Sequence, residues 1–190
     1  MFLKTLCEIR AGQTFKGSLD NYEPGEVTVV LPKDIVDGKI GDGVRKLASL
    51  EIPQLQKHVL KSGDILIANK GSKFSSYLHD DNGEPVVATT AFYVITPSEA
   101  IDPAFLHWYL NQDEAKHYFA MNATSSVMPL LTKKVLELLP VPVPVMEEQK
   151  KIAEFIELTG HEILLIEELL LRKKEFAENY IWERILKSQN

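Results

Sequence analysis

The sequence has almost no cysteine and no long apolar run, and both absences limit what the protein can be. Cys7 is the only cysteine among 190 residues, so no disulfide can form within the chain. A reducing cytoplasm is therefore the expected compartment. No apolar run reaches the roughly 20 residues that a membrane-spanning helix needs, and the first residues lack the apolar segment of a signal peptide. We expect a cytoplasmic protein that does not associate with a membrane.

The sequence also lacks the excess of basic residues that is typical of proteins that bind nucleic acid over their whole surface. The formal net charge is −6. Residues 1–140 carry 17 acidic and 14 basic residues, and residues 141–190 carry 10 and 7, so each part has a net charge of −3. A surface that binds nucleic acid must therefore be a local patch.

Motifs for catalysis and for cofactor binding are missing as well. The histidines have no metal-ligand spacing; they are His58, His79, His107, His117 and His161. Gly41-Asp42-Gly43 lacks the lysine and hydroxyl residue of a phosphate-binding loop. Asp64 and Lys70 lack the second acidic residue that a nuclease-like site would need, so Asp64 is interpreted as a turn residue that opens a strand. We predict no catalytic residue, no metal site and no cofactor.

Residues 1–140 contain the signals of an α+β domain that is rich in strands. A β-branched run at 26–31, an apolar run at 64–68 after a turn, and a third segment at 85–95 each predict a strand. Asp102-Pro103 predicts the start of a helix that continues or restarts through Phe119. Thr132 predicts the cap of a further helix.

Residues 141–190 predict a single long helix after an extended segment. Pro140, Pro142 and Pro144 keep the chain extended. Apolar residues then recur at helical spacing over about 40 residues, which corresponds to a rod of about 60 Å. One stripe has the spacing of a coiled-coil seam; it contains Ile152, Ile156, Ile163, Ile166, Leu170, Ala177 and Tyr180. Such a rod must pack on another helix, from a second copy or from a partner.

Three polar loops combine hydrogen-bond donors with aromatic residues; they are residues 10–18, 69–77 and 122–126. Such side chains can contact phosphates and base edges, although solvated loops without a function remain an alternative. Phe15, Phe74 and Tyr77 are expected to anchor the loops in the core. The candidate DNA contacts are Arg10, Gln13, Thr14, Lys16, Lys70, Ser72, Lys73, Ser75, Asn122, Thr124, Ser125 and Ser126.

The order of these segments is similar to that of a known family. The matching segments are residues 7–15, 27–30, 33–35, 60–66 and 102–110. The most specific match is Leu-Pro-Val-Pro at 139–142 followed by Met-Glu-Glu-Gln-Lys-Lys-Ile at 146–152. Together they resemble the specificity subunit of type I restriction-modification systems.

The resemblance implies a non-catalytic subunit whose target-recognition domain, residues 1–140, reads one half of a split site in double-stranded DNA. The long helix would be the spacer, and the expected partners are methyltransferase and restriction subunits. Members of the family usually carry two such domains, whereas this chain has one, which implies a half-length form and a homodimer through the C-terminal helix. The alternatives are a coiled-coil interaction protein and the recognition fragment of a fused type II restriction-methyltransferase.

Overall fold

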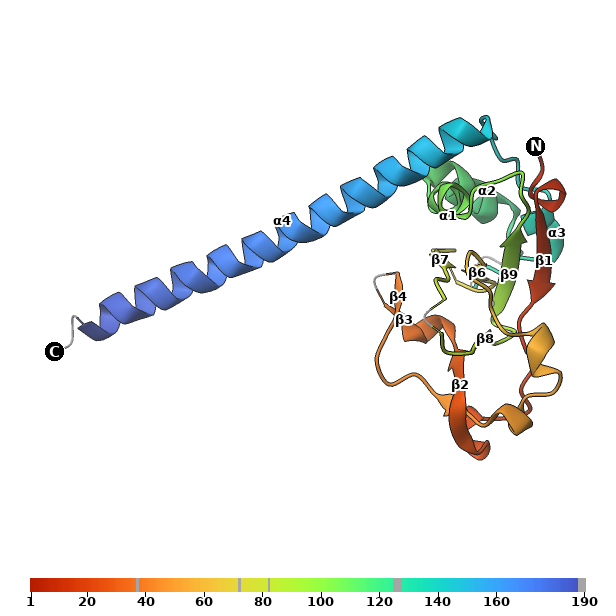
Figure 1. Cartoon of the computed structure of the whole chain (residues 1–190), viewed down its shortest axis with the longest axis horizontal. Helices are drawn as coiled ribbons and strands as arrows, with labels where there is room; N and C mark the ends of the chain where they lie inside the picture. Colours follow the sequence, from red (N-terminus) through yellow and green to blue (C-terminus); the bar gives the residue numbers. More distant parts are fainter. Residues whose placement is uncertain (37, 72, 82, 125–127, 188–190) are drawn as a thin grey trace. The chain divides into compact units, whose positions relative to one another are not determined.

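The structure is a computed structural model that describes residues 1–36, 38–71, 73–81, 83–124 and 128–187 (Figure 1). Contacts divide the chain into two compact units, Met1–Lys150 and Lys151–Asn190. The first unit, called the body below, contains the described strands and three short helices, and the second consists of most of helix α4. The predicted α+β class with a long C-terminal helix is therefore confirmed.

The larger sheet of the body is antiparallel and has the strand order β1-β9-β6-β7. Its strands are β1 (Cys7–Ala11), β9 (Phe92–Pro97), β6 (Ile65–Ala68) and β7 (Ser76–Leu78). Ile65, Leu66 and Ile67 are all fully buried, because β6 has a neighbour on each edge and a covered surface on each face. The apolar run at 64–68 thus forms the predicted buried strand.

The smaller sheet has the order β5-β2-β8, with β5 (Lys46–Leu47), β2 (Pro24–Val30) and β8 (Val86–Ala88). β2 pairs with β8 in parallel, which brings together residues that are far apart in the sequence. The prediction of one strand over residues 85–95 is wrong. The chain turns at residues 89–91 and joins a different sheet as β9, so β8 and β9 are separate strands. A two-stranded hairpin, β3 (Ile35–Val36) and β4 (Lys39–Ile40), completes the strands.

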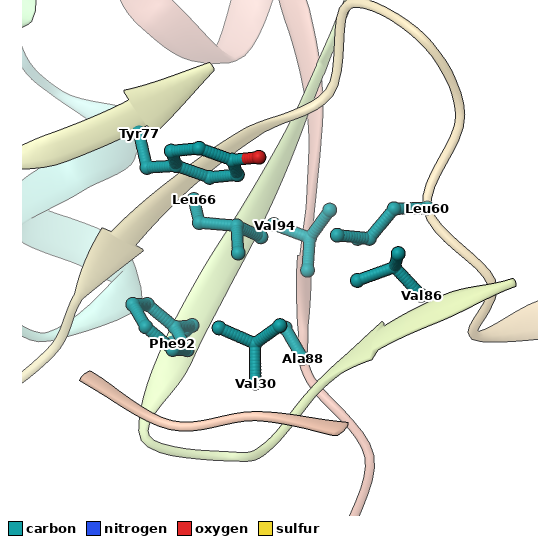
Figure 2. Close-up of a cluster of buried hydrophobic side chains, with 8 residues drawn as sticks. All are labelled: Val30, Leu60, Leu66, Tyr77, Val86, Ala88, Phe92 and Val94. Carbon is teal, nitrogen blue, oxygen red and sulfur yellow. The ribbon is translucent and has the colours of Figure 1, made fainter. Parts of the chain in front are cut away.

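The core lies between the two sheets. Figure 2 shows its main cluster, in which Val30, Val86 and Ala88 of the smaller sheet face Leu66, Phe92 and Val94 of the larger one, with Leu60 and Tyr77. The opposite face of the smaller sheet is also covered, since a second cluster contains Val27, Val29, Leu47, Ile52 and Val87. Successive strand residues point to opposite faces, so β2 contributes to both clusters.

Three short helices follow the sheets: α1 (Pro103–Leu110), α2 (Asp113–Asn122) and α3 (Lys133–Glu137). The Asp102 carboxylate accepts a hydrogen bond from Phe105 N at 3.0 Å, and Pro103 occupies the first turn of α1. Thr132 Oγ1 accepts from Val135 N at 3.3 Å at the start of α3. Both predicted caps are confirmed, and the helical segment after α1 restarts as α2.

The exit segment of the body runs beside its first residues. Leu3 N donates to Leu139 O at 3.0 Å, and Val141 N donates to Met1 O at 2.7 Å. Leu139 and Val141 are buried, whereas Pro140 and Pro142 are exposed. Helix α4 (Met146–Lys187) then has 42 residues, about 63 Å of helix at 1.5 Å per residue. In the described parts of the chain, no helix is long and apolar enough to cross a membrane.

Candidate DNA-binding surface

Two of the three polar loops lie side by side and share backbone hydrogen bonds. Gly71 N donates to Pro129 O at 3.0 Å, and Leu131 N donates to Asn69 O at 2.8 Å. Lys70 also forms an isolated β-bridge with Leu130. The loop at 69–77 and the segment after α2 are therefore held together, although about 50 residues separate them in the sequence.

The third loop, at 10–18, reaches the other two through the turn at 89–91. Gln13 N donates to Ala88 O at 2.7 Å, and Thr90 N donates to Gln13 O at 3.0 Å. Asn69 in turn donates through Nδ2 to Thr90 O at 2.7 Å. A Cβ on Gly12 would lie 2.2 Å from Thr89 O, so glycine is required there. The loop at 10–18 thus contacts the turn at 89–91, which also contacts Asn69, and we refer to residues 10–18, 69–77 and 122–131 as the three-loop cluster.

The three-loop cluster has a charge opposite to that of the whole chain. It carries the basic residues Arg10, Lys16, Lys70 and Lys73 and no acidic residue, in a protein whose net charge is −6. Lys16, Lys70 and Lys73 are exposed. The cluster is therefore a local concentration of basic residues in an acidic chain.

A residue with a strained backbone, Phe74, anchors the loop at 69–77, which we call the central loop. Phe74 has φ +42°, a backbone conformation that costs roughly 1–2 kcal/mol for a residue with a Cβ. Its ring is buried and packs edge-on against Phe119, with centroids 5.9 Å apart. Because the ring points inward, the neighbouring Lys73 and Ser75 remain exposed. The expectation that Phe74 anchors the loop rather than stacks on a base is confirmed for the free protein.

Tyr77 and Phe15, the other two aromatic residues of the loops, also pack on the core clusters. Tyr77 is buried in the main core cluster, and Phe15 packs against the second cluster with its ring 5.6 Å from that of Tyr22. Beside Tyr77, Ser76 N donates to Asn111 Oδ1 at 3.1 Å, and a ring nitrogen of His107 lies 3.2 Å from Ser76 O. Burial lowers the pKa of His107, which favours its neutral form at this contact. These contacts attach the end of the loop to α1.

A pocket of about 380 Å³ opens beside the central loop. Its inner wall is apolar and is formed by Ile35, Ala68, Phe74, Tyr77 and Phe92, while the two exposed lysines of the loop also line it.

Two of the predicted contacts are engaged inside the body. Arg10 Nη2 lies 3.5 Å from Oδ2 of the buried Asp64, which also accepts hydrogen bonds from Thr96 Oγ1 at 2.6 Å and Lys61 N at 3.0 Å. Gln13 is only 6% exposed. Both side chains would have to leave these positions to contact DNA. The bond from Lys61 N agrees with the interpretation of Asp64 as a turn residue.

The remaining predicted contacts fall into two groups. Ser72, Ser125 and Ser126 lie outside the described residues. The side chains that are described and exposed are Thr14, Lys16, Lys70, Lys73, Ser75, Asn122 and Thr124.

Two basic residues that no sequence motif indicated lie beside the loop at 10–18. Lys33 and Arg45 line a hollow of about 280 Å³ together with Gly17 and Ser18. Arg45 also donates through Nη2 to Tyr22 O at 3.2 Å. Segment 31–35 lines both this hollow and the pocket beside Lys70. No local pattern could reveal Lys33 and Arg45, because only the β2–β5 pairing brings their segments together.

The predicted seam of α4 is exposed along most of the helix. Ile163, Ile166, Leu170 and Tyr180 are each 49–57% exposed. The remaining seam residues are the half-buried Ile152 and Ile156 and the exposed Ala177. Further large apolar side chains flank the seam, among them Phe155, Leu169 and Phe176. An apolar surface of this length on one helix is typical of a surface that another helix covers.

Two observations on the described residues concern metal binding and the single cysteine. In the described ranges, no group of three or more histidine, cysteine or acidic residues is placed to hold a metal ion. Burial raises the pKa of the Cys7 thiol to about 12, so Cys7 is not a nucleophile at neutral pH.

Comparison with solved structures identifies the fold. The fold is similar to the crystal structure of the HsdS subunit from Thermoanaerobacter tengcongensis, with a TM-score of 0.62 at 18% identity. That match covers 86% of this chain and 37% of the other. The body and the long helix are thus an architecture already known among specificity subunits.

Sequence comparison gives the family. Residues 1–172 match the type I restriction modification DNA specificity domain, and the chain belongs to this family. It is 22% identical to the type I restriction enzyme MjaIX specificity subunit of Methanocaldococcus jannaschii over 96% of this chain. It is 30% identical to the MjaVIII specificity subunit of the same organism over 80% of this chain. The chain spans only 40% and 37% of the lengths of these relatives.

Proposed function

We propose that this protein recognises one half of a bipartite DNA site as the specificity subunit of a type I restriction-modification complex. The observation that carries the proposal is the three-loop cluster, which is basic and free of acidic residues in an acidic chain of this family. Its exposed contacts are Thr14, Lys16, Lys70, Lys73, Ser75, Asn122 and Thr124. Action on cellular DNA places the protein in the cytoplasm.

The second half of the site is read by a second copy. The matched relatives are more than twice as long as this chain, and a two-fold dimer of this chain reads a symmetric, interrupted sequence. The exposed apolar face of α4 supports this arrangement, because it needs a partner helix to cover it. The length of α4 then determines the gap between the half-sites.

Catalysis belongs to the partners, which are methyltransferase and restriction subunits. The isolated protein binds DNA weakly, since only three exposed lysines of the cluster are available for phosphates. Three neutralised phosphates per copy give a salt dependence of about −2.7 in log K against log salt concentration. The methyltransferase subunits supply further phosphate contacts.

Methylation sequencing tests the proposal. The protein is co-expressed with its methyltransferase subunit in a host without other methylation systems. We expect methylation at one interrupted, symmetric sequence. Methylation that does not depend on this protein, or none at all with a methyltransferase that is active on DNA with another specificity subunit, contradicts the proposal.

A second function follows from the exposed face of α4, namely a coiled-coil module whose body binds another protein. The two functions differ in what purifies with the chain. A methyltransferase subunit in the complex supports DNA specificity, and a complex without one that leaves DNA unbound supports the interaction module. For the fused type II fragment, a catalytic domain encoded in the same reading frame is the distinguishing observation.

A further inference from the structure

Gln149 is the one residue of α4 that is buried among those described, with 1% of its surface exposed. It lies in the first turn of the helix and still belongs to the body, whose last residue is Lys150. Glutamine is rarely buried without a function for its amide, because burial of an unpaired polar group is costly. Its surroundings therefore require an explanation.

The side-chain amide of Gln149 forms three hydrogen bonds, all with backbone atoms of the body. Gln149 Oε1 accepts from Asp102 N at 2.9 Å. Gln149 Nε2 donates to Pro144 O at 2.9 Å and to Ala100 O at 3.3 Å. The three bonds thus join the first turn of α4 to two segments, the start of α1 and the proline-rich exit. We call this group the Gln149 clasp.

The clasp requires an amide in particular. The site offers one N–H donor and two carbonyl acceptors, which only a side chain with one oxygen and one NH₂ group can satisfy together. A glutamate of the same shape can accept from Asp102 N, but its second oxygen would face two carbonyl oxygens. An apolar side chain would leave all three backbone groups unpaired.

The body residues that bind Gln149 are themselves fixed by further hydrogen bonds. The Asp102 carboxylate caps α1 by accepting from Phe105 N at 3.0 Å, while the backbone N–H of Asp102 serves Gln149. The neighbouring Ile101 is 1% exposed and its N–H donates to Ser98 O at 3.2 Å. One residue therefore connects the start of α1 to the start of α4. The prolines of the exit segment alone would not provide this connection.

We propose that Gln149 is a positioning residue that fastens the root of α4 to the body and thereby restricts the gap lengths that the assembled complex accepts. The part of this inference that concerns gaps rests on the proposed function. Restriction follows because α4 is one unbroken helix. If the first turn of α4 can change its angle to the body, the distance between the DNA half-sites bound by the two copies can therefore change as well.

Hydrogen exchange on the full-length protein tests the clasp without DNA. We expect the Asp102 amide to be protected and its exchange to accelerate at least about tenfold in Gln149→Glu, as for a local opening. Amides of β6 should not change. Lys150→Gln is the matched control, because it lowers the charge of the same helical turn by one unit at an exposed position.

The helix dipole predicts the opposite result, which sharpens the test. An acidic residue near a helix N-terminus stabilises an isolated helix, so Gln149→Glu would slow exchange if only the dipole mattered. Gln149→Met, which keeps the length of the side chain without its amide, should behave like Gln149→Glu. An Asp102 amide that is unprotected in the wild type, or unchanged in both variants, overturns the clasp.

The effect on spacing is measured with the methyltransferase complex on duplexes whose half-sites are separated by gaps of different length. We expect the wild-type complex and Lys150→Gln to methylate one gap length, and Gln149→Glu to accept neighbouring lengths as well. A single gap length in Gln149→Glu, despite fast exchange at Asp102, overturns the role in spacing. A wild-type complex that methylates no duplex overturns the proposed function, while hydrogen exchange still decides the clasp.

Discussion

Two apolar triplets of this chain, one in the body and one in α4, differ in how far they are buried. Ile65-Leu66-Ile67 in the body is fully buried, whereas Leu169-Leu170-Leu171 in α4 is 53–57% exposed. Both are three consecutive branched aliphatic residues, and their sequences differ little. The strand that carries the first triplet has neighbours at both edges, and the helix that carries the second has no covering element in its own unit.

The difference separates two sources of stability. Burial within the body is complete in a single chain, so its folding free energy does not depend on protein concentration. The apolar surface of α4 contributes free energy only when another helix covers it, so its contribution depends on concentration. Recognition and assembly therefore respond to different substitutions.

Truncation of a leucine in each triplet gives the largest contrast. Leu66→Ala should lower the free energy of unfolding by about 2–5 kcal/mol, because it leaves a cavity between the two sheets. Leu170→Ala in the monomer should change it by less than about 0.5 kcal/mol, as at other exposed positions. Urea unfolding at a concentration where the protein is monomeric measures both, and equal effects would contradict the division into two regions.

A charged residue in the seam of α4 tests whether the apolar face of this helix forms the dimer. Leu170→Asp should weaken dimerisation about 100-fold, which corresponds to nearly 3 kcal/mol, because it buries a carboxylate in an apolar interface. The unfolding of the body should not change. Analytical ultracentrifugation over a range of concentrations gives the dissociation constant, and Glu178→Asp on the same helix is the control. A wild type that stays monomeric at tens of micromolar would refute the homodimer.

Removal of the two lysines of the central loop should affect DNA binding alone. Lys70→Ala combined with Lys73→Ala should weaken binding of cognate DNA by the complex about tenfold and lower the salt slope by about 2 per copy. Dimerisation should be unchanged. The matched control is Lys57→Ala with Lys61→Ala, two exposed lysines of the body outside the three-loop cluster. Equal losses in both double variants would show a nonspecific effect of charge.

Acid should produce the smallest of these effects, and only in the body. Burial lowers the pKa of His107, so the unfolded chain binds a proton more readily than the folded one. Its contribution to stability is complete above the ordinary histidine pKa of about 6.5 and decreases as the pH falls below that value. His107→Gln should make the free energy of unfolding less dependent on pH as the pH falls below about 6.5. Urea unfolding over this range measures the slope, with the exposed His117→Gln as control.

The elements that the sequence predicted correctly depend on neighbouring residues. The buried strand at 65–68 follows its own turn, and the caps at Asp102 and Thr132 bond to N–H groups three residues further on. Local chemistry therefore specifies them. The long helix was also predictable, because its apolar periodicity extends over ten turns.

The errors and omissions depend on distant residues. The turn that separates β8 from β9 is held by Gln13, more than 70 residues away. The ion pair of Arg10, which stays a predicted DNA contact, with the distant Asp64 was not foreseen. Lys33 and Arg45 reach the loop at 10–18 only through sheet pairing. Sequence patterns carry no record of such pairings, so the positions of loops are predictable while their neighbours are not.

The ladder between residues 1–3 and 139–141 has a consequence for synthesis on the ribosome. Residues 1–3 bond to Leu139 O and Val141 N, which are synthesised only after the described strands and short helices of the body. Until then the edge of β1 and the buried Leu3 and Leu6 lack part of their surroundings. Because the chain emerges in order, the body closes while α4 is being translated. The apolar helix therefore appears next to a domain that has only just finished folding, and two nascent chains on one message would meet at that stage.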